Sequence, residues 1–153
     1  MTDSIQDFID AGIERLYPDK WKRLVPFISV IEAGEIGIVV IHDREVGVLS
    51  ASAGVLSGLT FSPDLVRDVA NLNMDTVLGA YVLSEGQPGY WMIKYHIKLR
   101  YSWVEESAGS ARMILDSLNA VPDFVNKGID CLSPNYGGER WGTPGGWHLA
   151  VMD

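Results

Sequence analysis

The chain has 153 residues, of which 47% are apolar, and it carries a formal net charge of −8. A chain of this length can bury enough surface to fold as one domain without a structural metal or a disulfide. The negative charge repels nucleic acid, whose binding proteins concentrate Lys and Arg. The longest uncharged run, residues 46–63, contains too many Ser and Gly residues to span a membrane. We therefore expect an acidic domain that binds neither nucleic acid nor membrane.

Two features favour a cytoplasmic location. The single cysteine, Cys131, cannot form an internal disulfide, so nothing indicates an oxidising compartment. The first ten residues hold three acids and no base, which is the opposite of a secretory or transit peptide.

The N-terminal part predicts one helix followed by three strands. Apolar residues recur at helical spacing from Ile5 to Leu16, ahead of a stop at Tyr17-Pro18. A basic, aromatic linker, PDKWKRLVP, follows. Trp21 within it is either part of a partner-binding patch or an anchor in the protein's own core. Three β-rich runs joined by short polar turns then predict an antiparallel meander over residues 27–33, 36–42 and 46–53.

The middle of the chain predicts a helix and a long hairpin. Ser62-Pro63 is a strong helix start, because Ser can cap the first turn and Pro loses no needed N–H there. Strands are expected over residues 76–84 and 90–103, and the second alternates apolar and polar residues throughout. Pairing Ser84 with Tyr90 brings the apolar sets of the two strands onto one face and places Gly79 beneath Tyr95.

The C-terminal part predicts a helix and a tail. Ser102-x-x-Glu105 is a capping-box pattern, and the apolar spacing that follows predicts a helix that Pro122 breaks or restarts. Beyond Ser133-Pro134 the chain is rich in Gly and Pro, with aromatic side chains that can act as anchors. We expect a single domain over residues 1–133 and a tail or irregular flap over residues 134–153.

The predicted element order is αβββαββα. Runs of adjacent strands separated by helices indicate an α+β fold, in which helices pack on an antiparallel sheet.

No motif commits the chain to a chemistry. The three histidines lie about fifty residues apart, and neither metal-binding spacings nor glycine-rich phosphate loops occur. Cys131 could act as a nucleophile, but a lone cysteine on an apolar segment is more often a small buried hydrophobe. The pair Glu105-Glu106 could serve acid/base catalysis, but it suits the negative charge favoured in the first turn of a helix. We expect a protein that is not an enzyme and needs no cofactor.

Four potentially cationic side chains share one face of the predicted long strand, at alternate positions about 6.7 Å apart. This row is Lys94, His96, Lys98 and Arg100. It could grip an anionic ligand or an acidic peptide. The alternative is a solvated face whose charges keep the sheet from pairing with other chains. The residues expected opposite the row are apolar, which suggests partial cover by a helix or a second subunit.

Residues 61–138 resemble a known family. The stretches SPDLVRDVANLNMDTVLGAYVL and YWMIKYHIKLRYSWVEE, with a helix ending NAVPDFVNKGI, are similar to the YbjN-like family of sensory regulators and its fold relatives, the type III secretion chaperones. Members place Asn-x-x-Asn or a similar polar pair at the end of the middle helix. Here Asn71 and Asn73 hold that place, two residues apart instead of three.

The resemblance implies a small acidic cytosolic protein, often a homodimer, that binds another polypeptide or regulates without catalysis. Asn71 or Asn73 is expected to end the helix in the left-handed conformation, and a ligand role for their amides is the alternative. Two functions stay open. One is a non-enzymatic, chaperone-like or regulatory protein-binding module that acts as a homodimer. The other is an anion sensor with a pocket between the sheet and a helix, in which Lys94, His96, Lys98 and Arg100 meet the ligand.

Overall fold

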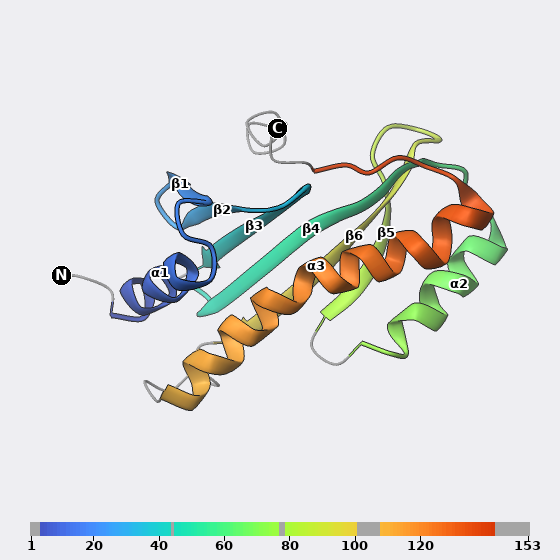
Figure 1. Cartoon of the computed structure of the whole chain (residues 1–153). Coiled ribbons are helices and arrows are strands. Elements are labelled where there is room, and N and C mark those ends of the chain that lie inside the picture. Colours follow the sequence, from blue (N-terminus) through green and yellow to red (C-terminus); the bar gives the residue numbers. More distant parts are fainter. Residues whose placement is uncertain (1–3, 44, 77–78, 101–107, 143–153) are drawn as a thin grey trace.

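The computed structural model describes residues 4–43, 45–76, 79–100 and 108–142. It contains a six-stranded antiparallel sheet with strand order β1-β2-β3-β4-β6-β5, covered by helices (Figure 1). The elements are α1 (Ser4–Leu16), β1 (Trp21–Val25), β2 (Ile28–Ala33), β3 (Ile36–Asp43), β4 (Val48–Leu59), α2 (Pro63–Asn73), β5 (Gly79–Glu85), β6 (Trp91–Arg100) and α3 (Ala108–Tyr136). The predicted α+β class and element order are confirmed, with one additional strand.

The additional strand is β1, which lies in the segment expected to be a linker. Its first residue, Trp21, pairs with Ile31 of β2 and packs against the core. The indole N–H of Trp21 donates to the carboxylate of Glu14, and Arg23 forms an ion pair with Asp10. Both acidic partners belong to α1. Trp21 therefore anchors the first strand to the first helix.

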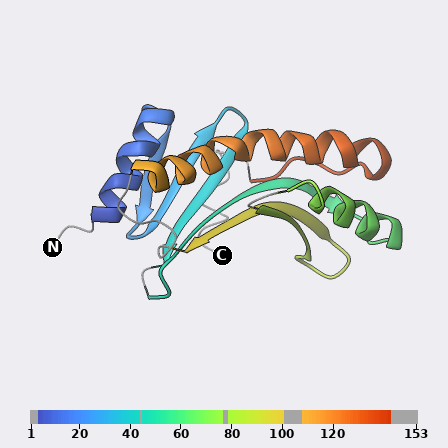
Figure 2. The same cartoon turned by 90° about the horizontal axis from the view of Figure 1, so that it is seen from below.

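The described helices pack on one face of the sheet. α3 runs lengthwise across it, with its N-terminal part beside α1 and its C-terminal part beside α2 (Figures 1 and 2). Ser62 caps α2 as predicted, accepting the N–H of Leu65 at 3.1 Å. No described helix is long and apolar enough to cross a membrane. The buried core draws on all three helices and includes Ile13, Leu65, Leu118, Val125, Ile31, Ile38, Ala51, Ile93 and Tyr95.

The β5–β6 hairpin has a different register from the expected one. Glu85 pairs with Trp91 and Tyr81 pairs with Tyr95, a shift of two residues. A two-residue shift leaves every side chain on its original face, so the alternation pattern cannot distinguish the two registers. Gly79 nevertheless lies against Tyr95, since an added Cβ would stand 2.5 Å from the Tyr95 hydroxyl.

Helix α3 passes through Pro122 without a break, so the predicted interruption is wrong. Proline removes one backbone hydrogen bond, here the bond to the carbonyl of Leu118, and its ring crowds the preceding turn. The flanking Val121 and Val125 are both buried against the sheet, and this packing holds the helix together across the proline. The helix also includes Pro134 and ends at Tyr136, inside the segment predicted as tail.

The residues after α3 lie against the sheet. Strand β4 extends beyond the end of β3, and Ser57 in this extension exchanges two backbone hydrogen bonds with Glu139, at 2.8 and 3.0 Å. The indole N–H of Trp141 donates to the carbonyl of Ile93 at 2.8 Å. Residues 137–142, which follow α3 in the predicted tail, therefore pack on the sheet, and we call them the strap. Residues 143–153 and the predicted cap at Ser102 and Glu105-Glu106 lie outside the described residues.

Candidate functional site

The face of the sheet opposite the helices is the main candidate site, and we call it the second face. Strand alternation selects its residues, because neighbours along each strand point to opposite sides of the sheet. Within the described part of the chain it carries no helix. Its residues include Lys22, Ile28, Val30, Glu32, Val39, Ile41, Ser50, Ser52, Gly54, Ala80, Val82, Ser84, Met92, Lys94, His96, Lys98 and Arg100.

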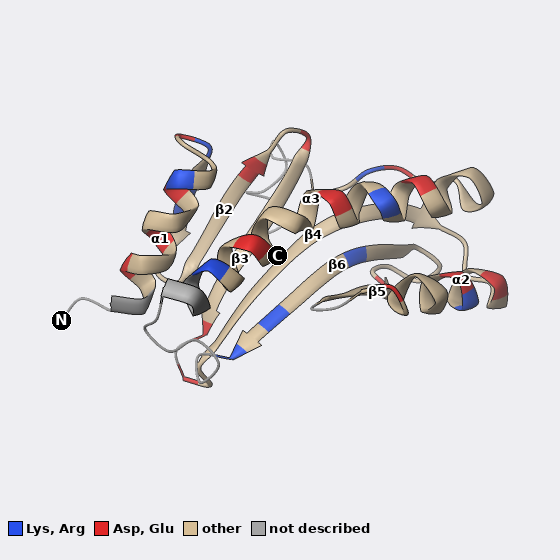
Figure 3. Ribbon diagram, turned by 60° about the horizontal axis from the view of Figure 1, so that its bottom comes forward, with Lys and Arg blue, Asp and Glu red and all other residues tan. Residues whose placement is uncertain are grey.

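The basic half of the second face is the predicted row on β6. Figure 3 shows its Lys and Arg residues as blue bands along this strand. Lys94 and His96 are half-buried, whereas Lys98 and Arg100 are exposed. The neighbours of the row on β5 are apolar: Ala80 pairs with His96, and Val82 pairs with Lys94. The structure therefore brings the four predicted residues together on one surface.

The aliphatic half of the second face lies on β2 and β3. Val30 pairs with Val39, and Ile28 pairs with Ile41. Ile41 is 39% exposed and Val39 is half-buried, whereas Val30 is fully buried at 0%.

A strip of small residues on β4 separates the two halves. Ser50, Ser52 and Gly54 pair with Lys98, His96 and Lys94, respectively. These short side chains lie between the longer ones of β3 and β6, and we call this strip the groove. At its Gly54 end, which we call the head, is a cavity of about 60 Å³ whose lining includes Val39, Ser52, Gly54, Lys94, Trp141 and Gly142. This strip was not predicted from the sequence. The alternating small residues of SASAG, residues 50–54, were the available signal.

His96 occupies the centre of the basic half. Its Nδ1 atom is buried and has no hydrogen-bond partner among the described residues. Burial lowers the pKa of His96 below its ordinary value of 6.5, and the positive charges of Lys94 and Lys98 lower it further. Deprotonation at neutral pH leaves the ring with one nitrogen that donates and one that accepts.

The two asparagines do not belong to this surface. Neither takes the left-handed conformation, so that prediction is wrong: Met74 caps α2 with φ of −67°. Asn71 is exposed. The amide of Asn73 bonds both backbone groups of Tyr81, donating at 2.9 Å and accepting at 2.6 Å. Asn73 thus replaces a neighbouring strand along the edge of β5.

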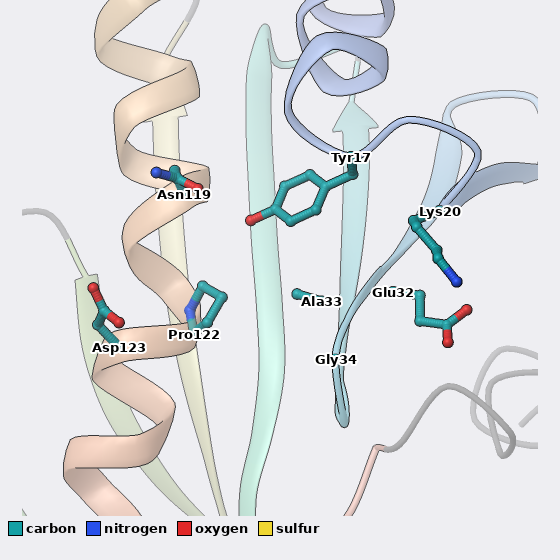
Figure 4. Close-up of a pocket in the computed structure, with 8 residues that line it drawn as sticks. All are labelled: Tyr17, Lys20, Glu32, Ala33, Gly34, Asn119, Pro122 and Asp123. Carbon is teal, nitrogen blue, oxygen red and sulfur yellow. The ribbon is translucent and has the colours of Figure 1, made fainter.

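A separate pocket of about 530 Å³ opens between the end of α1, the β2–β3 turn and α3. Figure 4 shows the Tyr17 ring reaching towards α3, with Lys20 and Glu32 near one another on the other side. Burial raises the pKa of the Tyr17 phenol, and the negative charge of Asp123 adds to this effect. The pocket contains none of the basic row, which lies on the other face of the sheet.

Cys131 is exposed on α3, in contrast to the predicted buried hydrophobe. Its position follows from the helical period, because the adjacent Leu132 takes the inward-facing place. Within the described ranges, no three His, Cys, Asp or Glu side chains gather in a way that could hold a metal ion.

The fold and the second face define an α+β sheet protein that has helices on one side and a mixed aliphatic and basic surface on the other. No family model and no curated protein matches the sequence. Among solved structures, the chain is similar to E. coli YbjN, with a TM-score of 0.44 and 12% sequence identity. That match covers 75% of this chain and 91% of YbjN.

Proposed function

We propose that the chain is a non-enzymatic protein-binding module, chaperone-like or regulatory, whose second face takes an extended acidic segment of another polypeptide. The observation that carries this proposal is the groove of Ser50, Ser52 and Gly54 between an aliphatic and a basic surface. Small residues let a bound backbone approach the sheet closely. The two flanking surfaces then select its side chains.

The groove favours a particular sequence pattern. Side chains of an extended peptide alternate in direction, and those of a peptide lying flat along β4 would point towards β3 and β6 in turn. The β3 side presents Val39 and Ile41, and the β6 side presents Lys98 and Arg100. A segment that alternates apolar and acidic residues therefore suits both sides.

A designed peptide tests this pattern directly. Fluorescence anisotropy would measure binding of a labelled peptide that alternates Glu and Val, beside a peptide of the same composition with the Glu and Val residues in separate blocks. We expect the alternating peptide to bind more tightly, and salt to weaken its binding because screening reduces exposed charge interactions. Equal affinity for the two peptides would contradict the groove model.

A triple variant tests the basic half. Lys94→Ser, Lys98→Ser and Arg100→Ser together should abolish binding of the alternating peptide. The matched control is Arg67→Ser with Arg112→Ser and Lys127→Ser, three cations with exposed side chains on the helices. Equal loss of binding in both proteins would show that net charge, and not the second face, attracts the peptide.

We also propose that the chain acts as a homodimer through β1. This strand is at one edge of the described sheet and presents Val25, which is 46% exposed. Edge strands offer free backbone groups for pairing with a second chain. Sedimentation of the wild type at micromolar concentration should give a dimer, and Val25→Lys should give a monomer. A monomeric wild type would overturn this arrangement.

The alternative function is a small-molecule anion sensor on the basic half. The Nδ1 atom of His96, which has no hydrogen-bond partner among the described residues, favours it: in the tautomer with the proton on Nδ1, this atom would donate to an oxyanion held by Lys94 and Lys98. Sulfate should then raise the unfolding temperature more than chloride at matched ionic strength. The triple Ser variant should lose that difference, and an unchanged difference would contradict this site.

A further inference from the structure

The strap runs from the end of α3 to the head of the groove, beside Gly54. Trp141 is held there by its hydrogen bond to Ile93, and its carbonyl oxygen would lie 2.3 Å from a Cβ added to Gly54. Only a glycine at position 54 permits this approach. Gly142, the last described residue, also lines the cavity and has a φ of +69°. The chain therefore continues beyond Gly142 from a fixed point on the second face.

The burial of Val30 indicates a cover over the aliphatic half. Val30 faces away from the helices, and its cross-strand neighbours on that face are Lys22 and Val39. Lys22 is itself exposed and Val39 is half-buried, so neither neighbour is enclosed. Val30 is nevertheless 0% exposed, although Ile41 on the same face is 39% exposed.

We infer that residues 143–153, TPGGWHLAVMD, dock in cis on the aliphatic half of the second face. In an extended segment Trp147, Leu149 and Val151 share one side, which suits the surface of Val30, Val39 and Ile41. Eleven extended residues reach about 36 Å. The distance across the sheet from β4 to β1 is only about 14 Å, so the segment is long enough.

This segment leaves the basic half largely unoccupied. Its one acidic side chain is Asp153, so it offers little to Lys94, Lys98 and Arg100. A partner that alternates apolar and acidic residues would engage both halves and displace it. This competition rests on the proposed function, whereas the cis contact itself does not. The segment would thus act as an internal competitor that rejects partners lacking acidic residues.

Paramagnetic broadening in the full chain tests the cis contact. In a Cys131→Ser background, a spin label is attached at Lys22→Cys, next to Val30, or at Arg67→Cys, an exposed position on α2 beside the opposite edge of the sheet. We expect the indole N–H signal of Trp147 to lose most of its intensity with the label at 22 and little with the label at 67. Trp21 is the internal control, because it adjoins the first label.

A pair of substitutions provides the matched control. Leu149→Asp places a charge on the side that faces the aliphatic half and should restore the Trp147 signal. His148→Asp places the same charge on the opposite side and should leave the broadening in place. If both labels affect Trp147 equally while Trp21 responds only to the label at 22, the cis contact is overturned.

Peptide affinity separates the two proposals. If the segment competes, the Leu149→Asp protein should bind the alternating Glu and Val peptide several-fold more tightly than the wild type does. Broadening of Trp147 with no peptide binding in either protein would support the cis contact and overturn the proposed function. Peptide binding with equal affinity in both proteins would overturn the competition.

Discussion

Asn73 at the end of α2 holds Tyr81 of β5 by a two-point hydrogen bond. Its amide nitrogen lies 2.9 Å from the Tyr81 carbonyl oxygen, and its amide oxygen lies 2.6 Å from the Tyr81 nitrogen. β5 is an edge strand of the sheet as far as the structure describes it, so these backbone groups have no described strand as a neighbour on that side. The asparagine side chain satisfies them and blocks pairing with another chain at that point.

Asn73→Ala should destabilise the fold. The substitution removes two hydrogen bonds at a partly buried site, and we expect a loss of about 1 to 3 kcal/mol in the free energy of unfolding. Urea denaturation measures it. Asn71→Ala is the control, since Asn71 is exposed and should change stability by less than about 0.5 kcal/mol. Equal effects of the two substitutions would contradict this assignment.

Gly54→Ala should displace the strap. The new methyl group would collide with the backbone of Trp141 at 2.3 Å, and backbone cannot move aside as a flexible side chain can. We expect a cost of about 1 to 3 kcal/mol and a shift of the Trp141 indole N–H signal. At Gly86 the nearest atom is the methyl group of Met92, at 3.1 Å. Gly86→Ala should therefore change the stability only slightly. An unchanged Trp141 signal in Gly54→Ala would contradict the close contact between Gly54 and the strap.

Tyr81→Phe should weaken the contact between β5 and α3. The Tyr81 hydroxyl donates to the carbonyl of Phe124, and burial raises the pKa of this phenol well above its ordinary value of 10.0. Loss of one such bond costs about 1 kcal/mol. Thermal unfolding would be compared with Tyr90→Phe, since Tyr90 is 44% exposed. A Tyr81→Phe protein as stable as the wild type would show that the bond contributes nothing.

His96 should make stability depend on pH. Its pKa in the folded protein is below the ordinary value of 6.5, so the unfolded chain binds the proton more tightly. The free energy of unfolding is then highest above pH 6.5 and falls as the pH drops from 6.5 through the folded-state pKa. His96→Gln should reduce this loss, measured by urea denaturation at about pH 8 and about pH 5. An identical loss in both proteins would exclude His96 as its source.

The sequence determined the class of the fold through local patterns. Alternation along β6 placed its basic row on one face, and Ser62-Pro63 located the start of α2. The alternation could not set the hairpin register, because a two-residue shift preserves both faces. The alternation also could not show β1, since Trp21–Val25 places two basic residues, Lys22 and Arg23, side by side, and only the pairing with β2 identifies the segment as a strand.

Tertiary structure alone decided how distant residues meet. The role of Asn73 depends on β5 passing the end of α2, which helical and strand periods do not specify. The continuity of α3 through Pro122 depends on burial of Val121 and Val125 against the sheet, which outweighs the local cost of proline. The groove needs β3, β4 and β6 side by side, although β6 lies more than thirty residues beyond β4 in the chain. Local propensities indicate most of the elements, and the pairing of distant elements builds the candidate surface.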